Sequence, residues 1–441
     1  MTEYSKGDYK RLSERIRKAP DAVSDDDLAM LQALRVTYKE PLALVFSTIE
    51  KMALKIDRGS ICTYRVKRIE SIIGKLTRFP DMQVQRMEDI AGCRCIMSST
   101  ELVYELFRKI ERNAARLPFE IKGKVNDYIA TPKASGYRSL HLNVTLRDGD
   151  SRRIEIQLRS YDHHNWATLV ETTDLIYKAK LKEYADKVSP ELFEFHKLLS
   201  IEDKELTRDQ KERIINISQQ FGYMEKIGTV FSINYLNVRD RWNQQRLQRC
   251  SFFLIAAGAD GLPEFNGYSN FLEAEEAYFN LYTNNHEQRN IVLTHLQRPT
   301  FQAISTAYSN YFLTYNAVLL RTLRMLSGLI INFFDYNRLR HFRRYYNYFF
   351  DIIVYWYSNK LAEIDSFHRD EVLRYSHAKK AEWTDSLKGG GKEVNDIISE
   401  LQDNLKLRAF HLILWTVKRS IDRRYIERML EIDERAKQAR M

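Results

Sequence analysis

Apolar and polar positions alternate most clearly near the middle of the chain. In residues 140–145, and again in residues 154–159, every second residue is apolar. Asp148-Gly149 lies between the two runs and is the dipeptide most typical of a tight hairpin turn. Side chains of a strand point alternately to its two faces, so the pattern predicts a β-hairpin with one apolar and one polar face. The polar face carries His141, Asn143, Thr145, Glu155, Gln157 and Arg159.

The loop before this hairpin combines a rigid residue, a cation, a flexible turn and an aromatic ring. These are Pro132, Lys133, Ser135, Gly136 and Tyr137. For an average hairpin, a solvated polar face is the simplest interpretation. Here a cation and an aromatic ring precede a face rich in polar side chains. The combination indicates a site for a phosphorylated ligand that contains a ring.

The rest of the chain is expected to be mainly helical, with a few short strands. Helical periodicity near 3.6 residues predicts helices in residues 1–57, 100–116 and 180–225, and a further helix is expected in residues 164–178. Residues 63–79 form an amphipathic stretch, for which a solvated basic helix face is the simplest interpretation. Residues 87–97 place Asp89 and Gly92 before a short apolar strand that carries Arg94. An acidic residue at the mouth of a strand, followed closely by an arginine, suits a metal beside a nucleotide.

A second region differs in pattern from the first. Strands are predicted at residues 230–236, 250–257 and 290–296, with helices at 271–282 and 301–312. Residues 313–441 are mostly helical, with a break at Gly389-Gly390-Gly391. The stretch 331–357 interleaves aromatic residues with arginines. Such a stretch either stacks on single-stranded RNA or forms a helix with a buried aromatic face and a basic edge; packing is favoured.

Composition and charge narrow the class of protein. The 441 residues are 44% hydrophobic, enough for a sizeable core, and the net charge of +10 favours anionic partners. The four cysteines lack the spacing of a zinc site and are expected to be reduced, which points to the cytoplasm. The polar N-terminus predicts no signal peptide. No window of about 18 uncharged apolar residues predicts a membrane span.

Four segments together resemble the synthetase domain of the RelA/SpoT homologue family. They are YRVKRIESIIGKL, EDIAGCRCI, NDYIATPKASGYRSLHLNV and IEIQLRS, in the family's order and spacing over roughly residues 60–180. The resemblance implies an α+β fold, with a mixed β-sheet nucleotidyltransferase-like domain flanked by helices. It also implies transfer of the β,γ-pyrophosphate of ATP to the 3′-hydroxyl of GDP or GTP, which makes the alarmones ppGpp and pppGpp.

The resemblance assigns one group of residues to the donor ATP and the metal. Arg65 and Arg94 would sandwich the adenine, which suits planar guanidinium groups. The donor phosphates would be bound by Lys67, Ser71 and Lys75. Asp89 and Glu155 would bind Mg²⁺, and Glu155 would also activate the acceptor hydroxyl. Pyrophosphoryl transfer independently calls for cations, a carboxylate-held Mg²⁺ and a base.

A second group would bind the acceptor. Tyr137 would stack on the acceptor base, with Lys133 and His141 near its phosphates. Gln157 and Arg159 would complete the polar wall of the hairpin. One departure concerns Asn126, because the family usually has a basic residue immediately before its DYI tripeptide. Lys122 or Lys124 could substitute for it, and the identity of the acceptor depends on this point.

Four domains are expected. They are N-terminal helices at 1–57, the synthetase domain with closing helices at 58–225, a small αβ module at 226–312 and a helical aromatic and basic region at 313–441. About sixty residues precede the motifs, too few for the hydrolase domain of the long family members. We therefore expect the chain to synthesise and not to degrade its product.

Alternative functions stay open at this point. Some small family members are toxins that pyrophosphorylate the 3′ end of tRNA or make adenosine alarmones. A toxin would need an antitoxin or regulatory protein, fused or separate, and residues 226–441 could serve that control. A homo-oligomer is also open. The alternative of another class is a non-catalytic module that binds nucleotides or RNA.

Overall fold

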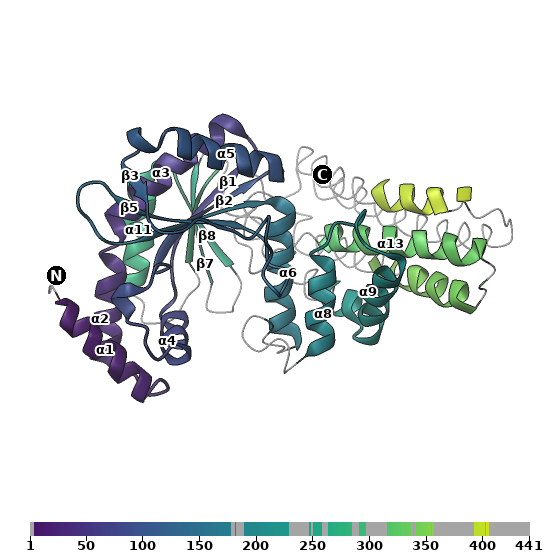
Figure 1. Ribbon diagram of the computed structural model, residues 1–441, viewed down its shortest axis with the longest axis horizontal. Coiled ribbons are helices and arrows are strands. Elements are labelled where there is room, and N and C mark those ends of the chain that lie inside the picture. The colour runs from purple at the N-terminus through teal and green to yellow at the C-terminus, as the bar shows by residue number, and fades with distance from the viewer. Residues whose placement is uncertain are drawn as a thin grey trace, which may run out of the picture. The chain divides into compact units, whose positions relative to one another are not determined.

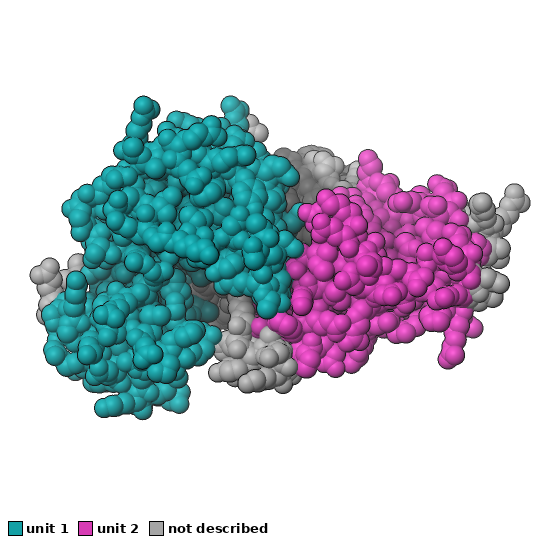
Figure 2. All heavy atoms as spheres, viewed as in Figure 1, with its two compact units in different colours: residues 1–168, 238–312 teal, residues 169–237, 313–441 magenta. Residues whose placement is uncertain are grey.

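The computed structural model describes residues 4–177, 181, 189–228, 247, 250–257, 263–284, 291–296, 315–336, 338, 340–353, 355–356, 392–401 and 403–404. The chain divides into two compact units (Figure 2). Unit 1 comprises residues 1–168 and 238–312, and unit 2 comprises residues 169–237 and 313–441. Both units are therefore built from two separate parts of the chain.

Unit 1 is organised around one mixed sheet (Figure 1). Its described strands run in the order β3-β5-β6-β2-β1-β9-β7-β8, and β4 also pairs with β5. β2 and β6 pair in parallel, and the other neighbours are antiparallel. The bounds are β1 Ile61–Val66, β2 Ala91–Met97, β3 Phe119–Ile121, β4 Asn126–Asp127, β5 Leu140–Leu146, β6 Ile154–Ser160, β7 Phe252–Ala257, β8 Pro263–Tyr268 and β9 Ile291–His295.

The predicted hairpin is confirmed as β5 and β6. Gly149 has φ of +94° in the connecting turn, a backbone conformation that glycine adopts without a steric penalty. Leu140, Ile154 and the other apolar residues of the alternating pattern are fully buried on one face. Burying each such side chain stabilises the fold by about 1.5–3 kcal/mol. This burial fixes which residues face the other side of the sheet.

Helices cover the apolar face of the sheet. They are α3 (Lys39–Ile56), α5 (Thr100–Arg112) and α11 (Phe271–Asn284), whose buried residues join those of β1, β2, β5 and β6 in one core. α1 (Lys6–Lys18) and α2 (Asp25–Val36) contribute to the same core. α4 (Ile69–Arg78) follows β1, and α6 (Tyr161–Tyr177) follows β6. The helices expected in residues 1–57, 100–116 and 164–178 are confirmed within these bounds.

Two expectations about secondary structure need correction. Residues 63–79 are not one helical stretch, because residues 61–66 form β1 in the middle of the sheet and only α4 is helical. The cross-strand partners of β1, which periodicity within one segment does not reveal, decide this. Residues 263–268 form β8, although no strand was expected there.

Residues 226–312 were expected to form a small αβ module of their own. Their described strands instead continue the sheet of unit 1, since β9 pairs with β1 through Cys62, Thr63 and Tyr64. The strand expected at 230–236 and the helix at 301–312 lie outside the described residues. The other expected domain boundaries stay predictions.

Unit 2 is helical in its described part. It contains α8 (Pro190–Leu199), α9 (Arg208–Gln220), α13 (Tyr315–Asp335) and helical residues 340–353 and 392–401. Phe342, Tyr345 and Phe349 are buried, whereas Arg340 and Arg343 are exposed. These three aromatic side chains therefore pack in the protein interior, as the packing interpretation expects, whereas Tyr336 is exposed. Gly389–Gly391 lie outside the described residues.

None of the helices that the structure describes combines the length and the apolar character needed to cross a bilayer.

Candidate active site

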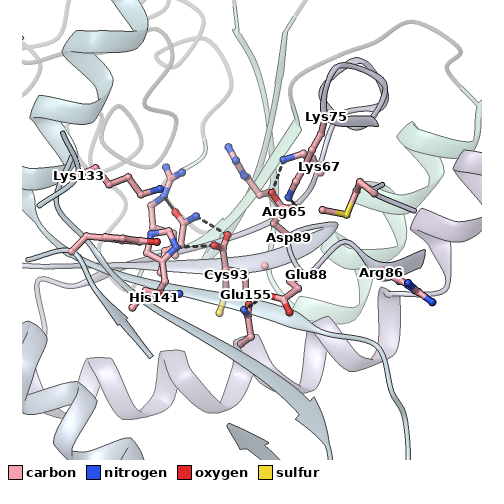
Figure 3. A pocket seen from close by; sticks show the side chains of 17 residues that line it. Arg65, Lys67, Lys75, Arg86, Glu88, Asp89, Cys93, Lys133, His141 and Glu155 are labelled. Carbon is pink, nitrogen blue, oxygen red and sulfur yellow. Dashed lines mark hydrogen bonds and ion pairs between the residues drawn. The ribbon is translucent and has the colours of Figure 1, made fainter. Parts of the chain in front are cut away.

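A cavity of about 490 Å³ opens on the polar face of the sheet (Figure 3). β1, β2, β5 and β6 form its floor, and α4 and the segments 82–89 and 126–133 contribute to its walls. Most of the lining side chains are charged or polar. They are Arg65, Lys67, Lys75, Met82, Arg86, Glu88, Asp89, Gly92, Cys93, Arg94, Asn126, Tyr128, Lys133, His141, Asn143, Glu155 and Gln157.

Strand register explains why residues so distant in sequence meet here. Asn143 pairs with Glu155, Glu155 with Gly92, and Gly92 with Arg65, which makes one row across four strands. A second row joins residues 126, 141, 157, 94 and 63 in the same way. Paired residues of neighbouring strands share a face of the sheet. In the first row, β5, β6 and β1 each place one polar side chain on the cavity face, and β2 contributes Gly92.

Gly92 is needed for close packing of the two parallel strands. A Cβ atom at this position would lie 2.6 Å from the backbone oxygen of Glu155 and 3.3 Å from its Cβ atom. The absence of a side chain therefore leaves room for Glu155 beside β2. Because residue 92 is glycine, the Glu155 side chain has space at the floor of the cavity.

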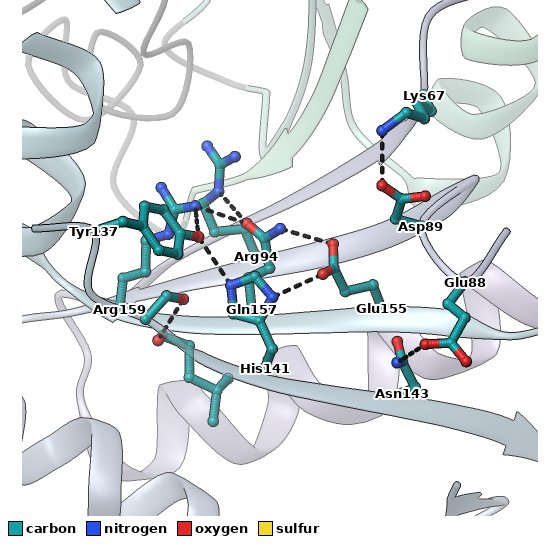
Figure 4. Close-up of polar contacts among 12 residues, drawn as sticks. Lys67, Glu88, Asp89, Arg94, Tyr137, His141, Asn143, Glu155, Gln157 and Arg159 are labelled. Atoms are coloured by element: carbon teal, nitrogen blue, oxygen red, sulfur yellow. Dashed lines mark hydrogen bonds and ion pairs between the residues drawn. The ribbon is translucent and has the colours of Figure 1, made fainter. Parts of the chain in front are cut away.

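Glu155 is held at both carboxylate oxygens (Figure 4). His141 Nδ1 lies 2.8 Å from Oε1, and Gln157 Nε2 donates to Oε2 at 2.7 Å. Gln157 in turn accepts from Arg159 at 2.9 Å and from Arg94 at 3.3 Å. Burial raises the pKa of Glu155, but the hydrogen bond and the charge of His141 outweigh burial, so this pKa lies below its usual value. Glu155 is therefore a carboxylate at neutral pH and can accept a proton.

Tyr137 closes this network behind His141. Its hydroxyl lies 2.9 Å from His141 Nε2 and accepts from Arg159 at 2.6 Å. Burial raises the pKa of Tyr137, but Arg159 and His141 together outweigh it and lower the pKa to about 7. Burial lowers the pKa of His141, and the hydrogen bond to Glu155 raises it above its usual value overall. Tyr137 thus orients His141, which orients Glu155.

Asp89 forms a second cluster on the other side of the cavity. Lys67 Nζ lies 2.7 Å from Oδ2, and Lys75 Nζ lies 2.8 Å from Oδ1. Burial raises the pKa of Asp89, but the two ammonium groups outweigh it and lower the pKa. Burial is the largest effect on the pKa of Lys67, and this pKa is lowered overall although Asp89 raises it. Both lysines line the cavity, so an anionic ligand bound there could replace Asp89 as their ion-pair partner.

The donor set suits a hard divalent cation that also binds substrate phosphates. No group of three or more histidine, cysteine, aspartate or glutamate side chains arranged for a metal occurs in the part of the chain that the structure describes. Asp89 and Glu155 do line one cavity, and Glu88 beside them pairs with Asn143 at 2.7 Å and with Arg153. Mg²⁺ typically takes one or two carboxylates and fills its other positions with water and phosphate oxygens. Asp89 and Glu155 fit that requirement.

The cavity brings together most of the residues expected from the sequence. Its lining includes Arg65, Lys67, Lys75, Asp89, Arg94, Lys133, His141, Glu155 and Gln157. Ser71, Tyr137 and Arg159 are not among the lining residues. Ser71 lies in the first turn of α4, and the other two support the wall from behind. Lys122 and Lys124 do not line the cavity either, and Lys122 pairs with Glu120 at 2.5 Å.

Several lining residues were not assigned from the sequence. Asn143 could have been, because the alternation already places it beside His141 on the polar face. Tyr128 lies two residues after Asn126, and Lys133 Nζ lies 4.4 Å from the centre of its ring. Arg86 and Glu88 carry no local signal, since only folding brings the segment 82–89 over the strands.

Part of the chain is similar in sequence to known proteins. The family description "Region found in RelA / SpoT proteins" matches residues 64–182. GTP pyrophosphokinase YwaC of Bacillus subtilis is 31% identical over 160 residues, which are 34% of this chain and 72% of that protein. Guanosine-3′,5′-bis(diphosphate) 3′-pyrophosphohydrolase of Borreliella burgdorferi is 31% identical over 142 residues, 32% of this chain but only 20% of that protein.

A crystal structure of small alarmone synthetase 1 from Bacillus subtilis, bound to its product pppGpp, is 22% identical. The superposed region covers 44% of this chain and 97% of the synthetase chain, with a TM-score of 0.34. The family of this chain is assigned from the sequence matches and not from this structural similarity.

The mixed sheet and its cavity of carboxylates and cations define a domain of the GTP diphosphokinase-like pyrophosphotransferase class. The chain belongs to the RelA/SpoT family.

Proposed function

We propose that the domain transfers the β,γ-pyrophosphate of ATP to the 3′-hydroxyl of GDP or GTP. The observation that supports the proposal is that Asp89, Glu155 and several lysine and arginine side chains line the same cavity. The oxygen of the acceptor hydroxyl would attack the β-phosphorus of ATP, the bond between the α,β-bridging oxygen and that phosphorus would break, and AMP would leave. Catalysis of this kind rests on positioning and on neutralising phosphate charge.

The two sides of the cavity suit two different substrates. The side of the cavity formed by β1, α4, the segment 82–89 and β2 carries five cations: Arg65, Lys67, Lys75, Arg86 and Arg94. This side matches the charge of a triphosphate, so ATP is placed there, with Lys67 and Lys75 turning from Asp89 to its phosphates. Asp89 and Glu155 would hold Mg²⁺, which supplies further positive charge against the donor phosphates.

The chain's own residues account for the proton transfer. The acceptor hydroxyl would donate its proton to Glu155 as the attack proceeds. His141 and Gln157 hold the carboxylate in place from either side. Lys133 and Tyr128 lie where the acceptor would enter, and Tyr137 acts through His141.

A second candidate acceptor is the 3′ end of an RNA, or an adenosine nucleotide. In the described lining, Lys133 is the one lysine or arginine on the side of β4 and β5, where Asn126 replaces the basic residue usual in the family. A terminal RNA nucleotide carries less phosphate charge than GTP and needs fewer cations. This observation favours RNA, whereas the buried aromatics of unit 2 give it no support.

The test is transfer of label from γ-labelled ATP with Mg²⁺ to GDP, GTP, adenosine nucleotides or deacylated tRNA in separate reactions. We expect label in a guanosine nucleotide with the wild type and at least about 100-fold less with Glu155→Gln. Glu120→Gln, on the exposed edge strand β3, is the control and should leave the rate unchanged.

Other results would redirect the assignment. Label on tRNA or on an adenosine nucleotide would establish the second candidate. No transfer to any acceptor, together with normal ATP binding by both wild type and Glu155→Gln, would favour a binding module instead. An antitoxin, a regulatory protein and a homo-oligomer stay predictions.

A further inference from the structure

Residues more than 200 positions after β1 in the sequence form hydrogen bonds with this strand. Thr294 of β9 donates its hydroxyl to the Cys62 carbonyl at 2.9 Å. Tyr64 donates its hydroxyl to Glu275 of α11 at 3.0 Å. The backbone N–H of Val66 donates to the Tyr278 hydroxyl of α11 at 2.6 Å. The last of these contacts reaches the end of the strand that lines the cavity.

Strand pairing explains why Val66 depends on Tyr278. The register of β1 with β9 covers Cys62, Thr63 and Tyr64 and ends there, so Val66 lies beyond it. Val66 is buried, and a buried N–H without an acceptor is costly. The same register continued along β9 would bring Ile291 opposite Val66, but these two residues do not pair, and the Tyr278 hydroxyl accepts the Val66 N–H instead.

This bond lies next to two residues assigned to the donor nucleotide. Arg65 stands between Tyr64 and Val66 and, by strand alternation, points to the opposite face, where it lines the cavity. Lys67 follows Val66 and donates its backbone N–H to Ile90 at 2.6 Å. α11 therefore contacts both neighbours of Arg65 from behind, but only at Val66 does it bond to the backbone of the strand.

The position of the Tyr278 hydroxyl is itself set by packing. Its side chain is fully buried, and its ring meets the ring of Tyr64 at 5.1 Å and that of Phe279 at 5.1 Å, both edge to face. Such a ring has little freedom to turn. The hydroxyl is thus a fixed acceptor rather than a mobile side chain that happens to contact the strand.

We propose that Tyr278 is a positioning residue for the donor nucleotide, holding the end of β1 so that Arg65 and Lys67 face the cavity. The proposal rests on the proposed function for the assignment of these two residues to ATP. It makes the α11–β9 segment part of the donor site, and a partner or ligand that shifts α11 would change ATP affinity. Removing the hydroxyl should therefore weaken ATP binding and leave the maximal rate intact.

The experiment compares Tyr278→Phe with Tyr64→Phe in the full-length protein. Both variants keep the aromatic ring in the same cluster, but only the first removes the acceptor of Val66. Amide hydrogen exchange at residues 64–67, the affinity for a non-hydrolysable ATP analogue, and KM and kcat for ATP are measured for each. For Tyr278→Phe we expect faster exchange at Val66 and an analogue Kd and ATP KM raised by about fivefold, with kcat unchanged. For Tyr64→Phe we expect changes within about twofold.

Two outcomes would overturn the proposal. Unchanged exchange at Val66 in Tyr278→Phe would show that the hydroxyl does not anchor the strand. Equal loss of affinity in both variants would show a general packing effect. A wild type that does not bind the analogue would contradict the proposed function instead, because the exchange comparison reports on the anchor without any substrate.

Discussion

Among single residues, Tyr137 shows most clearly how tertiary contacts change an assignment. The family resemblance implies that this tyrosine stacks on the acceptor base. In the structure Lys133 Nζ and Arg159 Cζ lie 5.2 and 5.1 Å from its ring centre, and its hydroxyl is bonded to Arg159 and to His141. Stacking on the acceptor base stays a prediction, whereas orientation of His141 follows from these contacts.

The lowered pKa of Tyr137 gives a prediction about pH. Because its pKa in the folded protein is about 7 against an ordinary value of 10.0, the phenolate stabilises the folded state above pH 10, and this contribution is lost as the pH falls through about 7. The stability of the wild type relative to Tyr137→Phe should thus rise from about pH 7 to about pH 9. Denaturant unfolding at several pH values measures it.

Tyr104→Phe is the matched control for this experiment. Burial and Asp127 raise the pKa of Tyr104 to about 12, so the phenol stays protonated across the same range. The stability difference between the wild type and Tyr104→Phe should therefore stay constant with pH. A similar slope in both variants would contradict the assignment to Tyr137.

Gly92 gives a second prediction about a single position. Gly92→Ala would place a methyl group 2.6 Å from the Glu155 backbone oxygen, so β2 and β6 must move apart. We expect a loss of about 1–3 kcal/mol in the free energy of unfolding and a lower rate of pyrophosphate transfer. Gly74→Ala in α4 meets no atom within 4 Å and should be neutral or stabilising by up to about 1 kcal/mol. Equal effects of the two substitutions would be inconsistent with this explanation.

Among the elements, β9 has the largest consequence for the fold. It turns what reads as a separate module into an extension of the catalytic sheet, between β1 and β7. His295 on this strand lies 2.6 Å from Glu50 of α3, and its ring stacks on Phe252 at 4.4 Å. The strand is therefore tied both to the sheet and to the helix that covers it.

The bond between Thr294 and Cys62 tests this attachment. Thr294→Val keeps the shape of the fully buried side chain but removes the hydroxyl that bonds to the Cys62 carbonyl. We expect unfolding to require about 1–3 kcal/mol less free energy, because a buried acceptor is left without its partner. Thr77→Val, at an exposed position in α4, should change stability by less than about 0.5 kcal/mol. Calorimetric or denaturant unfolding measures both variants. Equal losses of stability in the two variants would contradict this prediction.

For the whole molecule, charge is the property most directly linked to the proposed function. The net charge of +10 is accompanied by five cations on the donor side of the cavity. Exposed electrostatic attraction is screened over about 10 Å at 0.1 M salt and about 3 Å at 1 M. ATP binding should therefore weaken several-fold across this range of salt.

Adenosine provides the control for this prediction, because it has the same base and no phosphate. Its binding should change little with salt. Isothermal titration of both ligands at several salt concentrations measures the difference. An ATP affinity that is insensitive to salt would argue against phosphate recognition by this set of cations.

Local signals along the chain were enough to predict several elements and candidate residues. The hairpin follows from alternation and Asp148-Gly149, the helices from their periodicity, and the candidate carboxylates Asp89 and Glu155 from their motifs. Each depends on neighbours within one segment, where period and turn chemistry operate.

The tertiary structure alone decided which segments pair. β1 is a central strand because β2 and β9 supply its partners, and the Val66 N–H is satisfied by Tyr278, more than 200 residues away. Arg86 and Glu88 join the cavity for the same reason. Long-range pairing depends on how whole surfaces fit and which buried groups find partners, and no periodicity within a segment records that.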